Sequence, residues 1–169
     1  MPDVNLRHEI DCDEDTFWDK CFFNEDYLTH LFMDELKMKG FKILEQHDDG
    51  KVLTRKVQVD PPVVGVPAPV KKAIGDTFTY VEDGTFDRAA KRFKFKVLPS
   101  AFGDKAKIFG EVWCEKLGDK KIARHAKMSV SVKVFMIGGF VEDKIVTDLK
   151  QSYALAAAFT SKWVKEKGL

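Results

Sequence analysis

Apolar residues at the C-terminal end of the chain recur at helical spacing. A helix turns by about 100° per residue, so positions three or four apart lie on one face. The apolar face between Gly138 and Leu169 consists of Val141, Ile145, Leu149, Ser152, Ala156, Phe159 and Trp163. This pattern predicts one long helix packed against a sheet. Because Ser152 and Ala156 are small, either the sheet bulges toward them or a molecule other than protein fills the gap.

The first apolar stretch alternates with polar residues with a period of two, which predicts a half-buried strand over residues 4–10. His8 falls on the apolar side of this strand and is expected to point inward. Asp13 or Asp15 can then cap a first short helix, and Asn24 a second one. The apolar residues of these helices are Phe17, Trp18, Cys21, Tyr27, Leu28, Leu31, Phe32 and Leu36.

From Gly40 onward the pattern is that of strands separated by turn signals. Asp48-Asp49-Gly50 and Asp83-Gly84 are expected to form tight turns, because Asp-Gly tolerates the positive φ that such turns need. Prolines between Pro61 and Pro69 lack sheet donors, so that stretch is predicted to be a long connection. The predicted strands cover residues 41–47, 52–59, 74–82, 89–98, 106–117 and 122–136.

The last predicted strand shows which side of the sheet is buried. Apolar residues occupy the even positions from Ala126 to Met136, and polar residues the odd positions from His125 to Lys133. A curved antiparallel sheet of seven strands around the long helix, with the two short helices capping one end, buries every apolar face. The sequence therefore predicts one α+β domain over residues 1–169.

Composition and charge narrow the classes of function. The chain has 169 residues, of which 44% are hydrophobic, and a formal net charge of +1, which gives no reason to expect a nucleic acid partner. The cysteines, Cys12, Cys21 and Cys114, form no CxxC pair, and no His/Cys cluster has zinc-ligand spacing, so we expect reduced thiols and no metal. The sequence shows no secretory signal and no membrane span, which predicts a cytoplasmic protein.

The order of predicted elements resembles the helix-grip fold of the START-like (SRPBCC) superfamily, which includes the major birch-pollen allergen, lipid-transfer domains and polyketide cyclases. Residues 130–142, Val-Ser-Val-Lys-Val-Phe-Met-Ile-Gly-Gly-Phe-Val-Glu, are similar to the junction of last strand and final helix in an uncharacterised bacterial branch. The resemblance implies an apolar cavity between sheet and helix that takes lipids, sterols, quinones or other apolar molecules. It implies no cofactor and no fixed set of catalytic residues.

Inward-facing positions supply the residues that would line this cavity. Aromatic and Met side chains suit an apolar ligand, because rings supply contact area and Met adapts its shape. A filled core without a cavity is the alternative, and residue types alone favour it. The predicted lining is Arg55, Phe78, Tyr80, Phe93, Phe95, Ile108, Gly110, Val112, Met128, Val130, Val132, Met136, Val141, Ile145, Leu149, Ser152 and Ala156.

Polar residues on the inner face are candidate anchors for a ligand. Arg55 shares a face with apolar neighbours, and a buried guanidinium needs an anionic partner. That partner is either Glu45 on the neighbouring strand, in a structural ion pair, or a ligand head group; a register error would instead place Arg55 in solvent. Glu45, His8 and Tyr80 are further anchor candidates, although a buried histidine or tyrosine is commonly a satisfied core residue.

Three classes of function follow from these observations. The first is a carrier or sensor for an apolar small molecule. The second is a cyclase- or hydrolase-type enzyme that uses His8, Glu45 and Tyr80, although motifs such as GxSxG, GxGxxG and HExxH are absent. The third is an interaction module with a solid core, whose partner surface is the outward-facing Phe109 and Trp113; monomer and homodimer both remain open.

The stretch from Pro61 to Pro69 is a candidate gate. Its valines and Phe102 either line an entrance, touch a membrane transiently, or fold back onto the domain. Lys71 and Lys72 follow directly and would favour an anionic surface. The valines concerned are Val63, Val64 and Val66.

Overall fold

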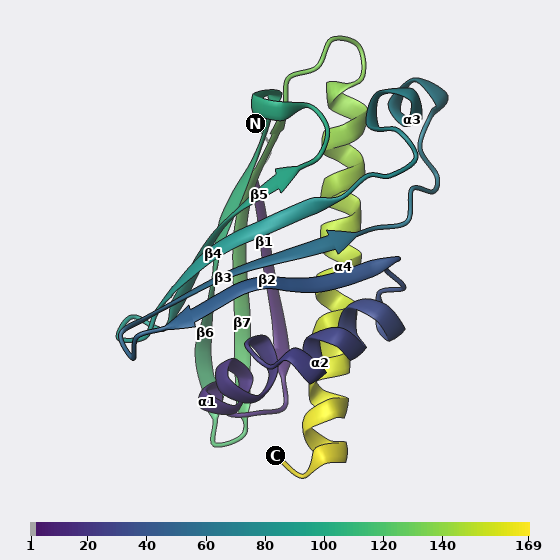
Figure 1. Cartoon of the computed structure of the whole chain (residues 1–169). Helices are drawn as coiled ribbons and strands as arrows, with labels where there is room; N and C mark the ends of the chain where they lie inside the picture. The colour runs from purple at the N-terminus through teal and green to yellow at the C-terminus, as the bar shows by residue number, and fades with distance from the viewer. Residues whose placement is uncertain (1–2) are drawn as a thin grey trace.

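A computed structural model describes residues 3–169 and contains a seven-stranded antiparallel sheet and a 30-residue C-terminal helix (Figure 1). The strands are β1 (Asp3–Ile10), β2 (Gly40–Asp48), β3 (Val52–Asp60), β4 (Tyr80–Asp87), β5 (Arg92–Pro99), β6 (Ala106–Gly118) and β7 (Lys121–Val132). The helices are α1 (Glu14–Thr16), η1 (Phe17–Phe22), α2 (Glu25–Thr29), η2 (His30–Glu35), α3 (Ala68–Ile74), η3 (Gly103–Lys105) and α4 (Gly138–Lys167).

The strand order across the sheet is β1-β7-β6-β5-β4-β3-β2, so the first two strands of the chain are its two edges. Strands β2 to β7 form a meander, and the short helices carry the chain from one edge to the other. Helix α4 crosses the sheet and contacts β1 and β7 (Figure 1). This is the helix-grip arrangement that the sequence predicts, with the short helices after the first strand.

Both ends of α4 are fixed by specific contacts. The Glu142 carboxylate accepts a hydrogen bond of 2.8 Å from the backbone N–H of Val132, which ties the first turns of α4 to the end of β7. Gly138 is glycine because a Cβ there would overlap the Val132 carbonyl oxygen. At the other end Gly168 adopts a φ of 67° and closes the helix.

Asp83-Gly84 is not a turn, which corrects the prediction from its turn signal. Both residues lie in the middle of β4, and the ring of Phe93 occupies the place where a Cβ of Gly84 would be. Gly84 therefore provides room for an aromatic ring on the inner face. The turn between β4 and β5 follows Asp87, whose carboxylate accepts hydrogen bonds of 3.0 Å from the N–H groups of Ala89 and Ala90.

The proline-rich stretch is a connection, as predicted, but it leads into a helix that the sequence analysis missed. Helix α3 begins directly after Pro67, and proline suits the start of a helix because the first N–H groups have no partner within the helix. Consequently β4 starts at Tyr80 rather than at Ile74. Phe78 lies in the loop before β4 and not in a strand.

Strand β7 ends at Val132, four residues before the predicted end at Met136. Its partner β6 begins at Ala106, which pairs with Val132, so residues beyond Val132 have no strand beside them. The chain turns there instead, and Met136 adopts a φ of 68°. Met136 is 79% exposed, so its predicted inward orientation is wrong.

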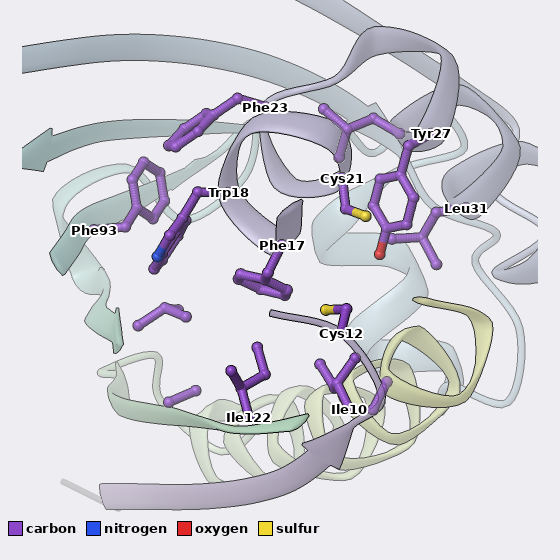
Figure 2. Close-up of a cluster of buried hydrophobic side chains, with 14 of the residues drawn as sticks. Ile10, Cys12, Phe17, Trp18, Cys21, Phe23, Tyr27, Leu31, Phe93 and Ile122 are labelled. Atoms are coloured by element: carbon purple, nitrogen blue, oxygen red, sulfur yellow. The ribbon is translucent and has the colours of Figure 1, made fainter. Parts of the chain in front are cut away.

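The space between the sheet and α4 is filled with aromatic side chains at the end of the molecule that carries α1 and η1. We call this the packed end. Trp18 packs against Phe86 and Phe23, with ring centroids 4.5 and 5.9 Å from its own. Phe17 and Trp18 from η1 point toward Phe93 and Ile122 of the sheet (Figure 2). The Tyr27 hydroxyl lies 2.6 Å from that of Thr160, which joins α2 to α4.

Candidate ligand-binding site

A cavity of about 320 Å³ lies between the sheet and α4. This volume is within the range of small-molecule pockets, and the lining is mostly apolar. Fully buried residues such as Phe93 and Val112 border it on the inside, whereas Val64, which is 64% exposed, borders it on the outside. The cavity therefore reaches the surface. We call this opening the mouth; it is formed by Pro61, Pro62, Val63, Val64, Val66 and Phe102.

Most of the predicted lining residues border the cavity. They are Arg55, Phe78, Tyr80, Phe93, Phe95, Ile108, Val112, Met128, Val132, Val141, Ile145, Leu149, Ser152 and Ala156. Val130 faces the interior but is enclosed by its neighbours, and Met136 lies on the surface. Gly110 is covered by the Met128 side chain, which occupies the place of a Cβ at Gly110. Ser152 and Ala156 thus lie beside empty volume, as their small size suggested.

Two groups of lining residues were not assigned to the wall from sequence. The helices after β1 supply the inner part, and α3 contributes beside the mouth. The apolar periodicity of these segments predicts that they are buried, but only the three-dimensional structure shows that they lie against α4. They are Phe17, Phe22, Tyr27, Leu28, Leu31, Phe32, Leu36, Val70 and Ile74. The three valines and Phe102, which were entrance candidates, line the mouth.

Arg55 points inward, as predicted, but Glu45 is not its partner. The Arg55 side chain is 4% exposed, and its Nη2 donates a hydrogen bond of 3.2 Å to Glu82 on β4. Its Nη1 donates to the carbonyl oxygen of Phe22. The guanidinium also lies over the rings of Phe22, Phe23 and Phe93, at 4.8 to 5.3 Å from their centroids. Arg55 therefore has a carboxylate and a backbone carbonyl as partners within the protein.

A β-bulge explains the error over Glu45. Strand β2 carries one extra residue, Leu44, between Ile43 and Glu45, which shifts the pairing by one position. Glu45 then lies opposite Lys56 instead of Arg55 and turns outward, where its carboxylate is 3.6 Å from the Lys56 ammonium. Glu45 is exposed and borders no part of the cavity, so it is not a polar anchor.

A second buried arginine, Arg124 on β7, borders the cavity and was missed from the sequence. Its Nη2 donates to the carbonyl oxygen of Tyr153 at 2.8 Å and to His8 Nδ1 at 3.1 Å. The guanidinium lies 4.8 Å from the centroid of the Tyr153 ring. Burial lowers the pKa of Arg124 below its ordinary value. The alternation that places Ala126 inward would have revealed Arg124 if extended by two residues.

His8 and Tyr80 have different places in the structure. His8 lies on the inner side of β1 as the partner of Arg124, and it does not border the cavity. Burial, followed by the charge of Arg124, lowers the pKa of His8. Tyr80 borders the cavity, as does Tyr153, and burial raises the pKa of both phenols. The acid–base set of His8, Glu45 and Tyr80 is therefore not assembled around the cavity.

The outer face of the sheet carries the other two residues of interest. Trp113 stacks on His125, with ring centroids 5.3 Å apart, and the Arg92 guanidinium lies 4.5 Å from its centroid. Phe109 is 47% exposed. Both face outward as predicted, but Trp113 is occupied by neighbours of its own sheet. Among residues 3–169, no three His, Cys, Asp or Glu side chains gather as ligands for a metal ion.

Solved structures with the same arrangement come from several kinds of protein. An aromatase/cyclase from a Streptomyces species matches with a TM-score of 0.67 at 10% identity, covering 99% of this chain and 96% of that one. Norcoclaurine synthase from Thalictrum flavum matches with 0.65 at 15% identity, covering 98% and 87%. A START superfamily protein from Mycobacterium smegmatis matches with 0.57 at 15% identity, covering 92% and 97%. These likenesses establish the START-like fold.

Sequence comparison adds the family but no activity. No curated protein sequence matches the chain. None of the helices described in residues 3–169 combines the length and apolar character needed to cross a membrane. A family model, described as "Protein of unknown function (DUF2505)", matches residues 5–164. That match covers nearly the whole chain, and the protein belongs to the DUF2505 family, here with a START-like helix-grip fold.

Proposed function

We propose that the protein binds an apolar small molecule of the lipid, sterol or quinone class between the sheet and α4, as a carrier or sensor. The observation that carries this proposal is the apolar cavity of about 320 Å³ with a mouth at the surface. An apolar void leaves its lining without contacts, and a ligand that fills it gains about 25 cal/mol for each Å² of apolar surface buried. Binding therefore has a physical driving force at this position.

The segment around the mouth suits the entry of a ligand. Residues 61–79 connect β3 to β4 without joining the sheet, and α3 lies within them. Gly65 and Gly75, on either side of α3, adopt positive φ values of 68° and 76°, where glycine moves without steric strain. Movement of α3 about these two glycines would widen the mouth and leave the sheet unchanged. The prolines restrict the conformations open to this segment, which reduces the conformational entropy lost when it closes again.

Structures of the same fold support the choice of a small organic ligand. One structure of norcoclaurine synthase from Thalictrum flavum is a complex with dopamine and hydroxybenzaldehyde, at 15% identity and a TM-score of 0.65 to this chain. A binding role is the best-supported one for this chain, because the residues considered for acid–base chemistry lie apart. A protein-interaction role has less support, because Trp113 on the outer face of the sheet is occupied by His125 and Arg92.

We also propose that the mouth end of the protein touches a membrane surface when ligand is exchanged. Phe135, Met136 and Phe140, at the junction of β7 and α4, are 90%, 79% and 62% exposed. Ile137 within this junction packs against the same buried cluster as Val66 and Phe102 of the mouth. Exposed Lys133 precedes it, and Lys71 and Lys72 lie on α3 nearby. Exposed apolar side chains beside cations suit an anionic lipid surface.

Filling the cavity tests the binding proposal. Ala156→Phe places a ring in the cavity, whereas Ala158→Phe places the same ring on the exposed side of α4 and serves as the matched control. Binding of a fluorescent apolar probe should be lost in Ala156→Phe and retained in Ala158→Phe. Ser152→Trp, with exposed Gln151→Trp as its control, repeats the test one turn earlier. Unchanged binding in Ala156→Phe and Ser152→Trp would contradict the proposed position of the site.

Native mass spectrometry identifies the ligand class. The protein is purified from its own host, and an organic extract of the same sample is analysed beside it. A discrete added mass that the extract resolves into one lipid, sterol or quinone class supports the proposal. Bare protein that takes up no member of such mixtures would contradict it.

A further inference from the structure

Arg124 is a buried cation without an anionic partner in the part of the chain from Asp3 to Leu169. Its side chain is 5% exposed, and no carboxylate of these residues lies within ion-pair distance of it. Within the same range, the enclosed Nε atoms of Arg124 and Arg55 both lack a hydrogen-bond partner, but only Arg55 has a carboxylate beside it, so the missing counter-charge sets Arg124 apart. A buried charge is costly unless it is paired, so a second group is expected to satisfy Arg124.

The other charged residues that border the cavity are already paired. Arg55 is joined to Glu82, as described above. Lys144 donates to both carboxylate oxygens of Asp148, at 2.8 and 2.9 Å, one turn along α4. Arg124 therefore leaves the wall of the cavity with one uncompensated positive charge. A single negative charge on a ligand would neutralise it.

The neighbours of Arg124 within the protein are neutral. His8 on β1 accepts its hydrogen bond, and burial together with Arg124 lowers the pKa of His8, so the imidazole is uncharged near neutral pH. Tyr27, Cys114 and Tyr153 also lie close to it, and burial raises the pKa of all three groups. Aromatic and carbonyl contacts lessen the cost of the buried charge but do not neutralise it.

The place of Arg124 sets the orientation of a ligand. Arg124 is two residues from Ile122, which lies in the packed end (Figure 2), whereas Val132 at the far end of β7 packs with Val70 near the mouth. At about 3.3 Å per residue, Arg124 and Val132 are separated by about 26 Å along the strand. A polar head group at Arg124 would therefore lie at the inner end of the cavity, with an apolar body extending toward the mouth.

We infer that the ligand of this cavity is an apolar monocarboxylic acid whose carboxylate pairs with Arg124. The inference rests on the proposed function and names its ligand class. Nη2 already donates to Tyr153 and His8, so the carboxylate would accept its hydrogen bond from Nη1, and its one charge balances the one unpaired charge of Arg124. An alcohol would leave the charge uncompensated, and a doubly charged phosphate monoester would leave a negative charge in an apolar cavity.

Decanoate and decanol, which share one chain length and differ in the head group, test this inference by calorimetric titration. Wild-type protein should bind decanoate about 10 to 100 times more tightly than decanol. This ratio corresponds to the free energy that hydrogen bonds to a charged group contribute. Arg124→Met should remove that preference, so that the ratio of the decanoate affinity to the decanol affinity falls at least tenfold, to about one or below. An affinity for decanoate that Arg124→Met leaves unchanged would overturn the inference while the apolar cavity stands. Failure of wild type to bind either probe would overturn the proposed function itself.

A direct measurement on wild-type protein covers the case in which Arg124→Met does not fold. The carboxyl carbon of decanoate is isotopically labelled, and its NMR shift is followed in the complex as the pH is lowered. Pairing with Arg124 should hold the pKa of the bound acid below that of free decanoate. A pKa above the free value would mean an unpaired acid in an apolar environment, which would overturn the inference. Arg124→Lys should retain part of the preference, because it keeps the positive charge but not the position and shape of the guanidinium.

Discussion

The packed end and the mouth end are enclosed by the same sheet and the same helix, yet they are filled differently. At the packed end, η1 inserts Phe17 and Trp18 between sheet and helix. Around the mouth the chain supplies prolines and valines, which border the space without filling it. A core is completed where an amphipathic segment adds a further layer, and it stays hollow where the connecting segment has too few large side chains.

The largest expected difference between the two ends is in stability. Trp18 is 2% exposed within the aromatic cluster, so Trp18→Ala should lower the free energy of unfolding by about 3–5 kcal/mol. Val64→Ala at the mouth should change it by less than about 0.5 kcal/mol, because Val64 is already in contact with solvent. Urea denaturation of both variants measures the difference. Equal losses would mean that the mouth is packed as tightly as the other end.

The elements with the strongest periodicity were predictable from the sequence. The apolar face of α4 and the alternation along β7 depend on local geometry, which is the same in any fold. They sufficed to place α4 on an antiparallel sheet and to identify most of the lining. The same argument also predicts an inward Arg124, because even-numbered positions such as Ala126 and Met128 lie on the inner face of β7.

The errors arose where one segment depends on another. Gly84 carries a turn signal by type, but its role is set by the Phe93 ring on the adjacent strand. The partner of Arg55 depends on a bulge at Leu44 that shifts the register of a neighbouring strand. The end of β7 depends on where β6 begins. None of these long-range relations is encoded in a local pattern of residues.

A smaller difference is expected in contact with membranes. Replacing Phe135 and Met136 together by serine should weaken binding to anionic lipid vesicles by about tenfold, because two apolar side chains no longer enter the interface. Leu117, at the β6–β7 turn of the opposite end, is 40% exposed, and Leu117→Ser is the matched control. Cosedimentation with vesicles measures both. Equal weakening by the control variant, or none by the double variant, would contradict a membrane-facing mouth.

The smallest expected effect is a pH dependence at the boundary between the two ends, where His8 accepts a hydrogen bond from Arg124. The pKa of His8 is lowered from its ordinary 6.5, chiefly by burial and then by Arg124. The unfolded chain therefore binds a proton at a higher pH than the folded protein does. His8 contributes its full stability above pH 6.5, and this contribution falls as the pH decreases toward the folded-state pKa.

Thermal unfolding at about pH 8 and about pH 5.5 detects this contribution, because the side chain of histidine changes charge within that range. His8→Asn keeps a hydrogen-bond acceptor for Arg124 without a titrating group, so its midpoint should fall less between the two pH values than that of wild type. His47→Asn, at an exposed site on β2, should retain the wild-type fall. If the midpoint of His8→Asn falls as much as that of wild type, the imidazole of His8 is protonated to the same extent in the folded and the unfolded protein.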